Sequence, residues 1–266
     1  MKNITTILPI HELETDEILM LNNALISVGD FHEDVKVTIV HPKELGPKVD
    51  QFLIESKGHE KLEVKTLPNT TDETDFVSQV NLGIEDCDTE WFSILEIDDE
   101  YRSVWLPSMK EYIEANKDVD VFLPIVRDVN VNGDFMGYMN ESVWAYGFSD
   151  KQGFLDLDLL MEFQNFQTSG GLYRTEVIKE YGKLKNNIKL TFSYEFLLRL
   201  SHRGVKIMTV PKLGYRHVNL RENSLFWRYK NDGDMLIAED EVKFWLDAAK
   251  TEYFFINKRE IKYESA

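Results

Sequence analysis

The sequence predicts an α/β fold in which helices cover both faces of a central mixed, mostly parallel sheet. Short apolar runs alternate with amphipathic segments over the first 125 residues, and another apolar run follows at residues 206–210. No internal repeat is present. Strands that alternate with helices form parallel sheets covered on both faces, and ligands bind beyond the carboxyl ends of such strands. The expected architecture is therefore a three-layer sandwich.

The expected elements follow this alternation along the chain. Apolar runs predict strands at residues 4–10, 35–40, 62–67 and 119–126, with another that begins at residue 91. Between these strands, two helices are predicted by apolar side chains three or four residues apart: Ile18, Leu21, Leu25 and Val28, then Phe76, Val80 and Ile84.

The second half of the chain is less regular. Residues 128–165 contain the turn signal Asn132-Gly133-Asp134 and predict irregular structure. Near the end of the chain, four apolar residues at helical spacing predict a packed helix: Ala238, Val242, Trp245 and Ala249.

Composition indicates a globular protein that can bury a full core. The chain has 266 residues, of which 43% are hydrophobic. No apolar run reaches the roughly 18 residues of a membrane span, and Met1-Lys2-Asn3-Ile4 leads into a strand instead of a signal peptide, so a cytoplasmic location is expected. Cys87 is the only cysteine, which excludes an intrachain disulfide and a cysteine-based zinc site.

Charge is distributed unevenly along the chain. The net charge is −17, yet residues 1–100 carry 7 basic and 23 acidic side chains whereas residues 174–230 carry 13 basic and 4 acidic ones. An evenly acidic surface would argue against nucleic-acid binding. The basic segment is either ordinary surface charge or a positive wall that holds an anionic donor or a polyanionic acceptor.

The apolar run Trp91–Leu95 ends abruptly in Glu96, Asp98, Asp99 and Glu100. Carboxylate oxygens are the ligands that magnesium and manganese prefer, and such an ion could clamp a diphosphate. The alternative is that these acids cap the following helix, where negative charge is favourable. Capping accounts for one acid and not for four, so the cluster predicts a divalent-metal site.

A series of motifs resembles the family 2 glycosyltransferases over about the first 225 residues. The motifs stand in the order that the family has them: Ile7-Leu8-Pro9, Asn81-Leu82-Gly83-Ile84, Asp98-Asp99-Glu100, Trp105-Leu106-Pro107, Thr168 to Arg174, Leu198-Arg199-Leu200, Val210-Pro211 and Tyr215-Arg216-His217. The resemblance implies a GT-A fold, which is Rossmann-like. It also implies a domain over residues 1–225, with a nucleotide-sugar half (1–127) and an acceptor half (128–225), and a helical extension over 226–266.

The same resemblance implies a metal-dependent glycosyltransferase. The enzyme would move a sugar from a nucleotide-diphosphate donor, expected to be a UDP-sugar, onto a hydroxyl, and would use Mn²⁺ or Mg²⁺. The implied metal ligands are Asp98, Glu100 and His217. The implied catalytic residues are Asp99 and Glu195. The implied donor-binding residues are Pro9, His11, His41, Asn81, Asp98, Gly170, Gly171, Arg221 and Ser224.

Several of these assignments have structural alternatives. A lone histidine such as His217 is more often a hydrogen-bonding residue than a ligand. Gly170-Gly171 could simply form a turn that needs positive φ. Where the family has an aspartate that reads the nucleoside base, Val40 is followed by His41-Pro42, which leaves the nucleotide preference open.

The family's catalytic carboxylate pair is missing. Phe192-Ser193 occupies its place, and neither side chain is a base. Glu195 is the nearest carboxylate and is favoured as its replacement. Asp156 or Asp158 could instead act from the central loop, or the enzyme could retain configuration and need no base there.

The acceptor also stays open, as do the donor sugar and the oligomeric state. A saccharide is the default, but the stretch 202–230 mixes basic and aromatic residues as nucleic-acid sites do, so a hydroxymethylated base of phage DNA is a second candidate. An inactive GT-A-like module that binds nucleotide-sugar or glycan is the main alternative to an enzyme. A nucleotidyltransferase is disfavoured because Pro9-Ile10-His11-Glu12 lacks the glycines of a phosphate loop.

Overall fold

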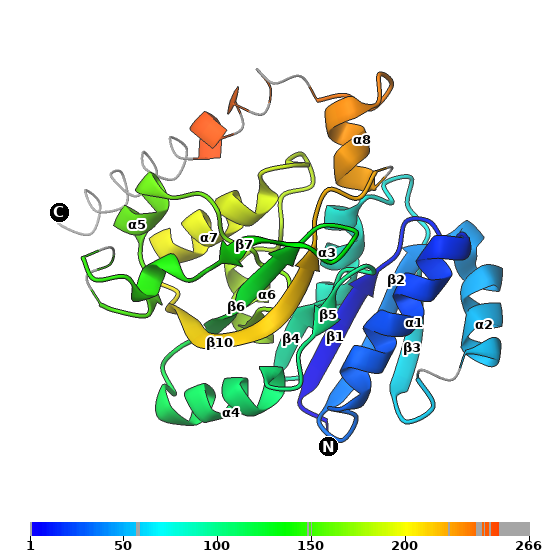
Figure 1. The fold of residues 1–266 in the computed structure, drawn as a ribbon, viewed down its shortest axis with the longest axis horizontal. Helices are drawn as coiled ribbons and strands as arrows, with labels where there is room; N and C mark the ends of the chain where they lie inside the picture. The colour runs from blue at the N-terminus through cyan, green and yellow to red at the C-terminus, as the bar shows by residue number, and fades with distance from the viewer. Residues whose placement is uncertain are drawn as a thin grey trace.

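The computed structural model describes residues 2–249 apart from 57–58, 148, 150, 223, 238–240, 242 and 245. Its centre is a ten-stranded sheet in the order β3-β2-β1-β4-β9-β6-β10-β5, with β7 paired to β6 and β8 paired to β10 (Figure 1). The strands are β1 Ile4–Pro9, β2 Val35–Pro42, β3 Glu63–Asn69, β4 Trp91–Ile94, β5 Glu100–Tyr101, β6 Val121–Val129, β7 Phe135–Met139, β8 Phe154–Leu155, β9 Leu172–Arg174 and β10 Ile207–Val218.

The long ladders of this sheet are parallel. β1 pairs in parallel with β2 and β4, β2 with β3, and β6 with β10. The antiparallel ladders have at most four residue pairs. Strand β9 joins the two parallel groups because it pairs with both β4 and β6. The predicted mixed, mostly parallel sheet is confirmed. The carboxyl ends of β1, β4, β6 and β10 consequently lie along one edge, which we call the carboxyl edge.

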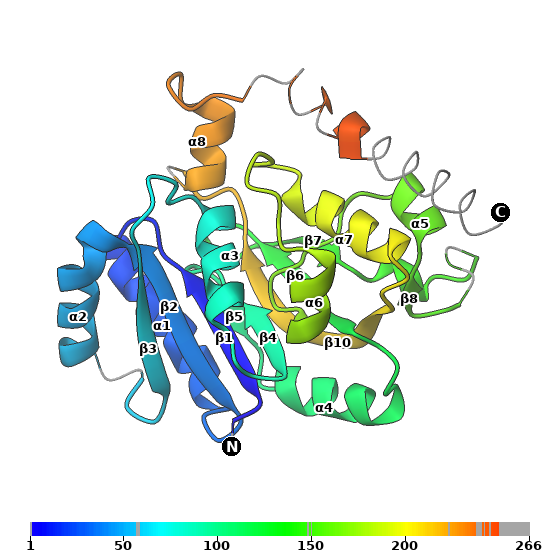
Figure 2. The same cartoon turned by 180° about the vertical axis from the view of Figure 1, so that it is seen from behind.

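Helices cover both faces of the sheet, as Figures 1 and 2 show from opposite sides. One face carries α1 Thr15–Gly29, α2 Gly46–Glu55 and α4 Trp105–Ala115, and the other carries α3 Phe76–Asp86, α5 Leu157–Glu162, α6 Thr175–Tyr181 and α7 Phe192–His202. Short 3-10 helices form at Lys43–Leu45 and Ser142–Trp144, and α8 Leu225–Asn231 follows β10. Each face has its own buried hydrophobic cluster.

Close packing between β1 and α3 depends on one glycine of the Asn-x-Gly-Ile motif. A Cβ atom at Gly83 would lie 2.5 Å from a methyl carbon of Ile7, closer than real Cβ contacts. The glycine therefore lets α3 approach β1, and the whole apolar face predicted from Phe76, Val80 and Ile84 is buried. Among the described residues, no helix is long and apolar enough to cross a bilayer.

Three local predictions were wrong. Ile18 is 44% exposed, because the buried face of α1 turns toward Leu21, Ala24, Leu25 and Val28. Residues 128–165 contain β7, β8 and α5 instead of irregular structure. The hairpin from β6 to β7 forms because Asn130 Oδ1 accepts hydrogen bonds from the backbone of residues 132 and 134.

The third difference is the length of β10, which continues past the predicted end at residue 210 to Val218. Register shifts between Val210 and Tyr215 absorb the irregular Pro211–Gly214 segment. In the C-terminal extension, α8 ends at Asn231, before the predicted packing helix, and Ala249 is buried. The predicted packing residues Ala238, Val242 and Trp245 lie outside the described residues.

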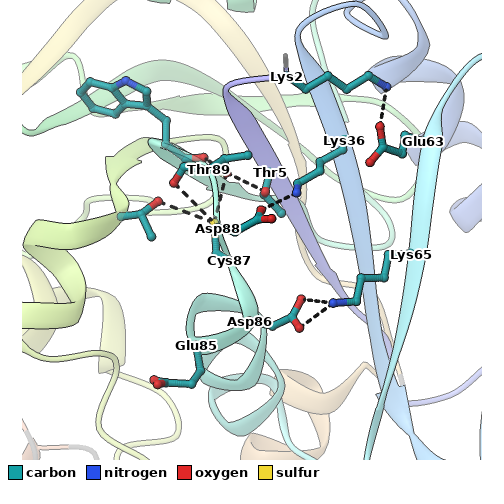
Figure 3. A network of polar contacts seen from close by, with 12 residues as sticks. Lys2, Thr5, Lys36, Glu63, Lys65, Glu85, Asp86, Cys87, Asp88 and Thr89 are labelled. Atoms are coloured by element: carbon teal, nitrogen blue, oxygen red, sulfur yellow. Dashed lines mark hydrogen bonds and ion pairs between the residues drawn. The ribbon is translucent and has the colours of Figure 1, made fainter.

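The opposite edge of the sheet, the amino edge, carries a network of paired charges (Figure 3). Lys65 Nζ bonds both carboxylate oxygens of Asp86 at 2.6 and 2.7 Å, and Lys36 bonds Asp88. Lys2 lies 3.7 Å from Glu63. Each of these three carboxylates at the amino edge therefore has a lysine partner.

Candidate active site

The acid cluster and His217 meet at the carboxyl edge of the sheet. The chain leaves the sheet after β4, and Asp99 N donates to Glu96 O in a turn (3.2 Å). β10 brings His217 to the same place. Glu96, Asp99 and His217 each offer one ligand atom, and these atoms lie within 4.8 Å of one another. Sequence segments about 120 residues apart thus build one site.

Hydrogen bonds hold the two carboxylates of this cluster in place. Asp99 is fully buried; its Oδ1 accepts from Val218 N at 2.8 Å and its Oδ2 lies 2.9 Å from His217 Nδ1. Glu96 Oε1 accepts from Ser169 Oγ at 2.7 Å and lies 3.4 Å from Gln167 Nε2. β10 therefore positions Asp99, and the loop before β9 positions Glu96.

The electrostatics of the cluster are those of crowded carboxylates. Burial and the charge of Asp99 raise the pKa of Glu96 from 4.5 to about 7. Burial alone would lower the pKa of His217, but the charge and hydrogen bond of Asp99 outweigh it and raise the pKa from 6.5 to about 10. In the absence of a metal, protonated His217 therefore supplies a positive charge that partly offsets the negative charges of Glu96 and Asp99.

Two carboxylates and an imidazole form a donor set that suits Mn²⁺ and also admits Mg²⁺. This set differs from the predicted one, in which Asp98 and Glu100 joined His217. Glu100 opens β5 and pairs with Arg216 in the ladder, where its carboxylate accepts from Arg216 Nη1 at 3.3 Å. Because side chains alternate along β10, Arg216 and His217 face opposite sides, and Glu100 lies away from the cluster.

Asp98 takes a different role at this edge. Its Oδ2 accepts from Arg221 Nε at 2.7 Å, and Arg221 Nη1 donates to Glu17 at the start of α1 at 3.0 Å. Burial and the charge of Asp99 raise the pKa of Asp98, which Arg221 opposes. Arg221 therefore bridges two carboxylates from separate elements.

A small cavity of about 90 Å³ lies beside the cluster, and we call it the donor cavity. It brings together five of the predicted donor-binding residues with His217: Pro9, His11, Asp98, Arg221 and Ser224. Burial lowers the pKa of His11, whose Nδ1 lies 2.9 Å from the carbonyl of Thr74. The side chain of Ser224 accepts from Trp227 N and begins α8, so α8 is fixed directly over this cavity.

A second cavity of about 460 Å³ adjoins the first, and we call it the acceptor-side cavity. Glu96, His217, Asn219 and Phe226 line both cavities. Ser193, which stands where the family has a catalytic carboxylate, lines this cavity and shares a hydrogen bond of 2.8 Å with Thr168. The metal-type cluster therefore lies at the boundary between two cavities.

Glu195, the favoured base, does not line either cavity. Its carboxylate is fully buried and accepts from Arg199 Nε at 3.0 Å, with Lys185 Nζ at 3.6 Å. Arg199 also donates to the backbone carbonyls of residues 181–183. The position two residues after Ser193 turns Glu195 to another side of α7, where it holds the loop after α6.

Two other predicted donor-binding residues lie away from the cavities. His41 is buried at the end of β2, and its Nδ1 lies 2.8 Å from the carbonyl of Pro42. Asn81 exchanges hydrogen bonds with the backbone of Leu184 and donates to Asn186. Asn81 thus ties α3 to the loop after α6 rather than contacting the donor cavity.

The two glycines of the predicted donor loop have packing roles. Gly170 has φ +78°, and a Cβ there would lie 2.4 Å from the ring of Tyr215. A Cβ on Gly171 would lie 2.7 Å from the hydroxyl of Tyr173. The positive φ of the structural alternative applies to Gly170, and at Gly171 the close packing against Tyr173 leaves no room for a side chain.

Sequence reasoning missed four participants at this edge: Glu17, Gln167, Ser169 and Phe226. It also noted Glu96 without assigning it to the metal. The available signal was the spacing of Glu96 and Asp99, three residues apart after a strand end, which a turn brings to one side. For Glu17 and Phe226 the sequence offers no signal, because only the folded chain brings Glu17 of α1 to Arg221 and Phe226 of α8 to the cavities.

No protein-family model matches the sequence, and no curated protein matches it. Solved structures do match. TarS residues 1–349 from S. aureus in complex with UDP-GlcNAc has a TM-score of 0.67 at 14% identity, over 95% of this chain and 66% of that chain. The mannosyltransferase PcManGT from Pyrobaculum calidifontis, in complex with GDP-Man and Mn²⁺, has a TM-score of 0.61 at 13% identity, over 96% of this chain and 70% of that one.

A longer TarS structure matches with a TM-score of 0.56 at 15% identity, and this chain spans 37% of its length. Likeness at such low identity is informative about the fold alone. The backbone arrangement agrees with the prediction made from the motif series. The chain therefore has the GT-A fold that its resemblance to the family 2 glycosyltransferases predicted.

Proposed function

We propose that the protein is a metal-dependent glycosyltransferase that moves a sugar from a nucleotide-diphosphate donor, a UDP-sugar, onto a hydroxyl. The observation that carries this proposal is the convergence of Glu96, Asp99 and His217 at the boundary of two adjoining cavities. The solved structures of the same fold with UDP-GlcNAc, or with GDP-Man and Mn²⁺, support it as analogues.

In this proposal Glu96, Asp99 and His217 hold Mn²⁺ or Mg²⁺. The bound ion would neutralise charge on the leaving diphosphate. The residues of the chain bind and orient the donor around it. Arg221 presents a guanidinium fork, which matches the geometry of phosphate oxygens and would exchange its carboxylate partners for the diphosphate.

The reaction itself forms one bond and breaks another. The acceptor oxygen bonds to the anomeric carbon while the bond from that carbon to the phosphate oxygen breaks, and the diphosphate leaves with the electron pair. The hydroxyl proton passes to a base or to solvent. Adjoining cavities that share Glu96 and His217 would hold the two substrates on either side of this bond exchange.

Calorimetric titration of UDP and other nucleoside diphosphates, with and without Mn²⁺, tests the donor site. We expect Mn²⁺-dependent binding in the wild type and its loss in Asp99→Asn. The matched control is Asp88→Asn, which removes a carboxylate at the amino edge. No nucleotide binding under any condition would contradict the proposal.

The second candidate is a binding module without catalysis. Ser193 favours it, because this residue stands at the position of the family's catalytic carboxylate. Turnover of the donor distinguishes the two. Release of UDP from a UDP-sugar that stops in Asp99→Asn supports the enzyme, whereas tight binding with no release in the presence of any acceptor supports the module.

A further inference from the structure

The lining of the acceptor-side cavity is rich in amide and aromatic side chains, and its acidic and basic side chains are Glu96, His217 and Lys230. Four side-chain amides line it: Gln164, Asn165, Gln167 and Asn219. The amides of Gln164 and Asn165 make no hydrogen bond within the described part of the chain, so both are available to a ligand. Sugars present many hydroxyl groups that both donate and accept, which is what a side-chain amide pairs with.

Aromatic rings form another part of the same lining. Phe192 and Phe226 stack with their ring centroids 5.8 Å apart and their planes inclined by 26°. Phe166 is also part of the wall. Apolar ring faces complement the C–H faces of a pyranose, while a volume of about 460 Å³ lies in the range of small-ligand sites.

Positive charge is scarce at this cavity. Lys230 is the one lysine or arginine among the described residues that line it. A duplex nucleic acid needs several lysine or arginine contacts to its phosphates, and a single lysine does not supply them.

Many basic side chains of residues 174–230 form ion pairs with carboxylates of the same chain. Seven of these side chains form ion pairs with carboxylates from residues 12–120: Arg174, Lys183, Lys189, Lys206, Arg216, Arg221 and Arg228. The charge asymmetry between the halves of the sequence is therefore a complementarity between parts of one fold. Paired in this way, these seven side chains do not form a free positive wall for a polyanion.

We infer that the acceptor is an uncharged carbohydrate that binds in the acceptor-side cavity, and not modified duplex DNA. This inference rests on the proposed glycosyl transfer and names the acceptor of that reaction. The amides of Gln164 and Asn165 bind acceptor hydroxyls, and the Phe192–Phe226 pair contacts an apolar sugar face. The acceptor hydroxyl then lies next to Glu96 and His217, which face both cavities.

The test screens labelled neutral oligosaccharides of glucose, galactose, mannose and N-acetylglucosamine against hydroxymethylcytosine-containing duplex DNA. Each is incubated with a UDP-sugar and Mn²⁺ at low salt, and transfer is measured by mass spectrometry. We expect transfer to a neutral oligosaccharide and none to DNA. Transfer to DNA, or transfer to neither class while the donor binds, overturns the inference.

Two variants test the assigned contacts. Asn165→Ala should raise the acceptor KM about fivefold, the value of one hydrogen bond, and leave the donor dissociation constant unchanged. Lys230→Gln removes the one lysine among the described residues that line the cavity, and we expect the salt dependence of transfer to match the wild type, because an uncharged acceptor has no phosphate for this lysine to contact. A salt slope that falls by about one unit in Lys230→Gln indicates a phosphate contact and counts against the inference.

Failure of the proposed function is distinguishable from failure of this inference. Donor binding is measured by calorimetry without any acceptor. Absence of Mn²⁺-dependent nucleotide binding overturns the transferase itself. Intact nucleotide binding, combined with an unchanged acceptor KM in Asn165→Ala, overturns only the placement of the carbohydrate.

Discussion

The two edges of the sheet carry the same residue types and differ in how these are arranged. At the amino edge, Asp86 and Asp88 each meet a lysine, and the side chain of Asp88 is 75% exposed. At the carboxyl edge, Glu96 and Asp99 converge on one point with His217. Exposed pairs satisfy each other, whereas converging buried acids require a cation or a proton.

This difference teaches that acid content alone does not mark a site. The sequence has Asp86-Cys87-Asp88 shortly before Glu96 and Asp98, and both segments contain closely spaced carboxylates. Only the second follows a strand at the carboxyl edge, where β10 supplies a facing histidine. Position within an α/β sheet therefore decides which cluster can hold a ligand.

The largest expected difference between the edges is the effect of removing one carboxylate on Mn²⁺-dependent UDP binding. Asp99→Asn should weaken Mn²⁺-dependent UDP binding by more than about 100-fold, because it removes a ligand oxygen, and loss of an outer partner alone costs 10- to 100-fold. Asp88→Asn should leave binding unchanged. Calorimetry on both variants measures this contrast, and equal binding by Asp99→Asn would place the metal elsewhere.

A second difference is pH dependence. Since the pKa of Glu96 is raised from 4.5 to about 7 and that of His217 from 6.5 to about 10, both groups hold protons that a metal must displace. Mn²⁺ affinity should therefore rise by more than about tenfold between pH 6 and pH 8. Affinity that is flat across this range would contradict the cluster as the ligand set.

The same pKa shifts determine the direction in which the stability of the metal-free protein changes with pH. A raised pKa stabilises the protonated native state, so the contribution of Glu96 is present below pH 4.5 and is lost as the pH rises through 7. The contribution of His217 is present below pH 6.5 and is lost as the pH rises through 10. Thermal unfolding in EDTA as a function of pH measures both contributions. The variant His217→Gln should lose the fall in stability between pH 6.5 and 10.

The next comparison concerns the effect on donor binding of replacing a basic residue at the carboxyl edge, Arg221, or at the amino edge, Lys36. Arg221→Lys keeps the charge and removes the fork that now bridges Asp98 and Glu17, so the donor dissociation constant should rise about tenfold. Lys36→Arg at the amino edge serves as the control and should change nothing. An unchanged dissociation constant in Arg221→Lys would remove this residue from the donor site.

The smallest expected effect lies at the amino edge. Lys65→Met breaks the pair with Asp86, in which the lysine side chain is 57% exposed, and should lower the free energy of unfolding by less than about 1 kcal/mol. Urea denaturation measures the change. A loss well above that value would mean that the exposed ion pairs at the amino edge contribute much more to stability than expected.

Much of this arrangement was predictable because strand and helix periodicity is local. The alternation of apolar runs predicted the parallel strands, and the end of β4 predicted where the acids would lie. The role of Glu100 was not predictable, because it depends on which side of β10 the short β5 pairs with. β9 has three residues, too few for a periodic pattern, although it joins the sheet at its centre.

Side-chain partners account for the remaining errors. Glu195 was expected to act as a base because it was the nearest carboxylate in sequence, but on α7 it pairs with Arg199 four residues later, a pairing that helical spacing could have indicated. The basic segment 174–230 suggested a polyanion because its acidic partners come from residues 12–120. A single sequence without the fold does not reveal such pairings.

The position of β9 and β10 in the sheet has a consequence for synthesis of the chain. β6 is complete at Val129, but β9 inserts between β4 and β6 only after residue 174 has emerged from the ribosome, and β10 follows at Val218. The nascent chain therefore holds an open sheet with unpaired edges until late in translation. His217 is among the last sheet residues to arrive, so the three proposed metal ligands meet only when the sheet is nearly complete.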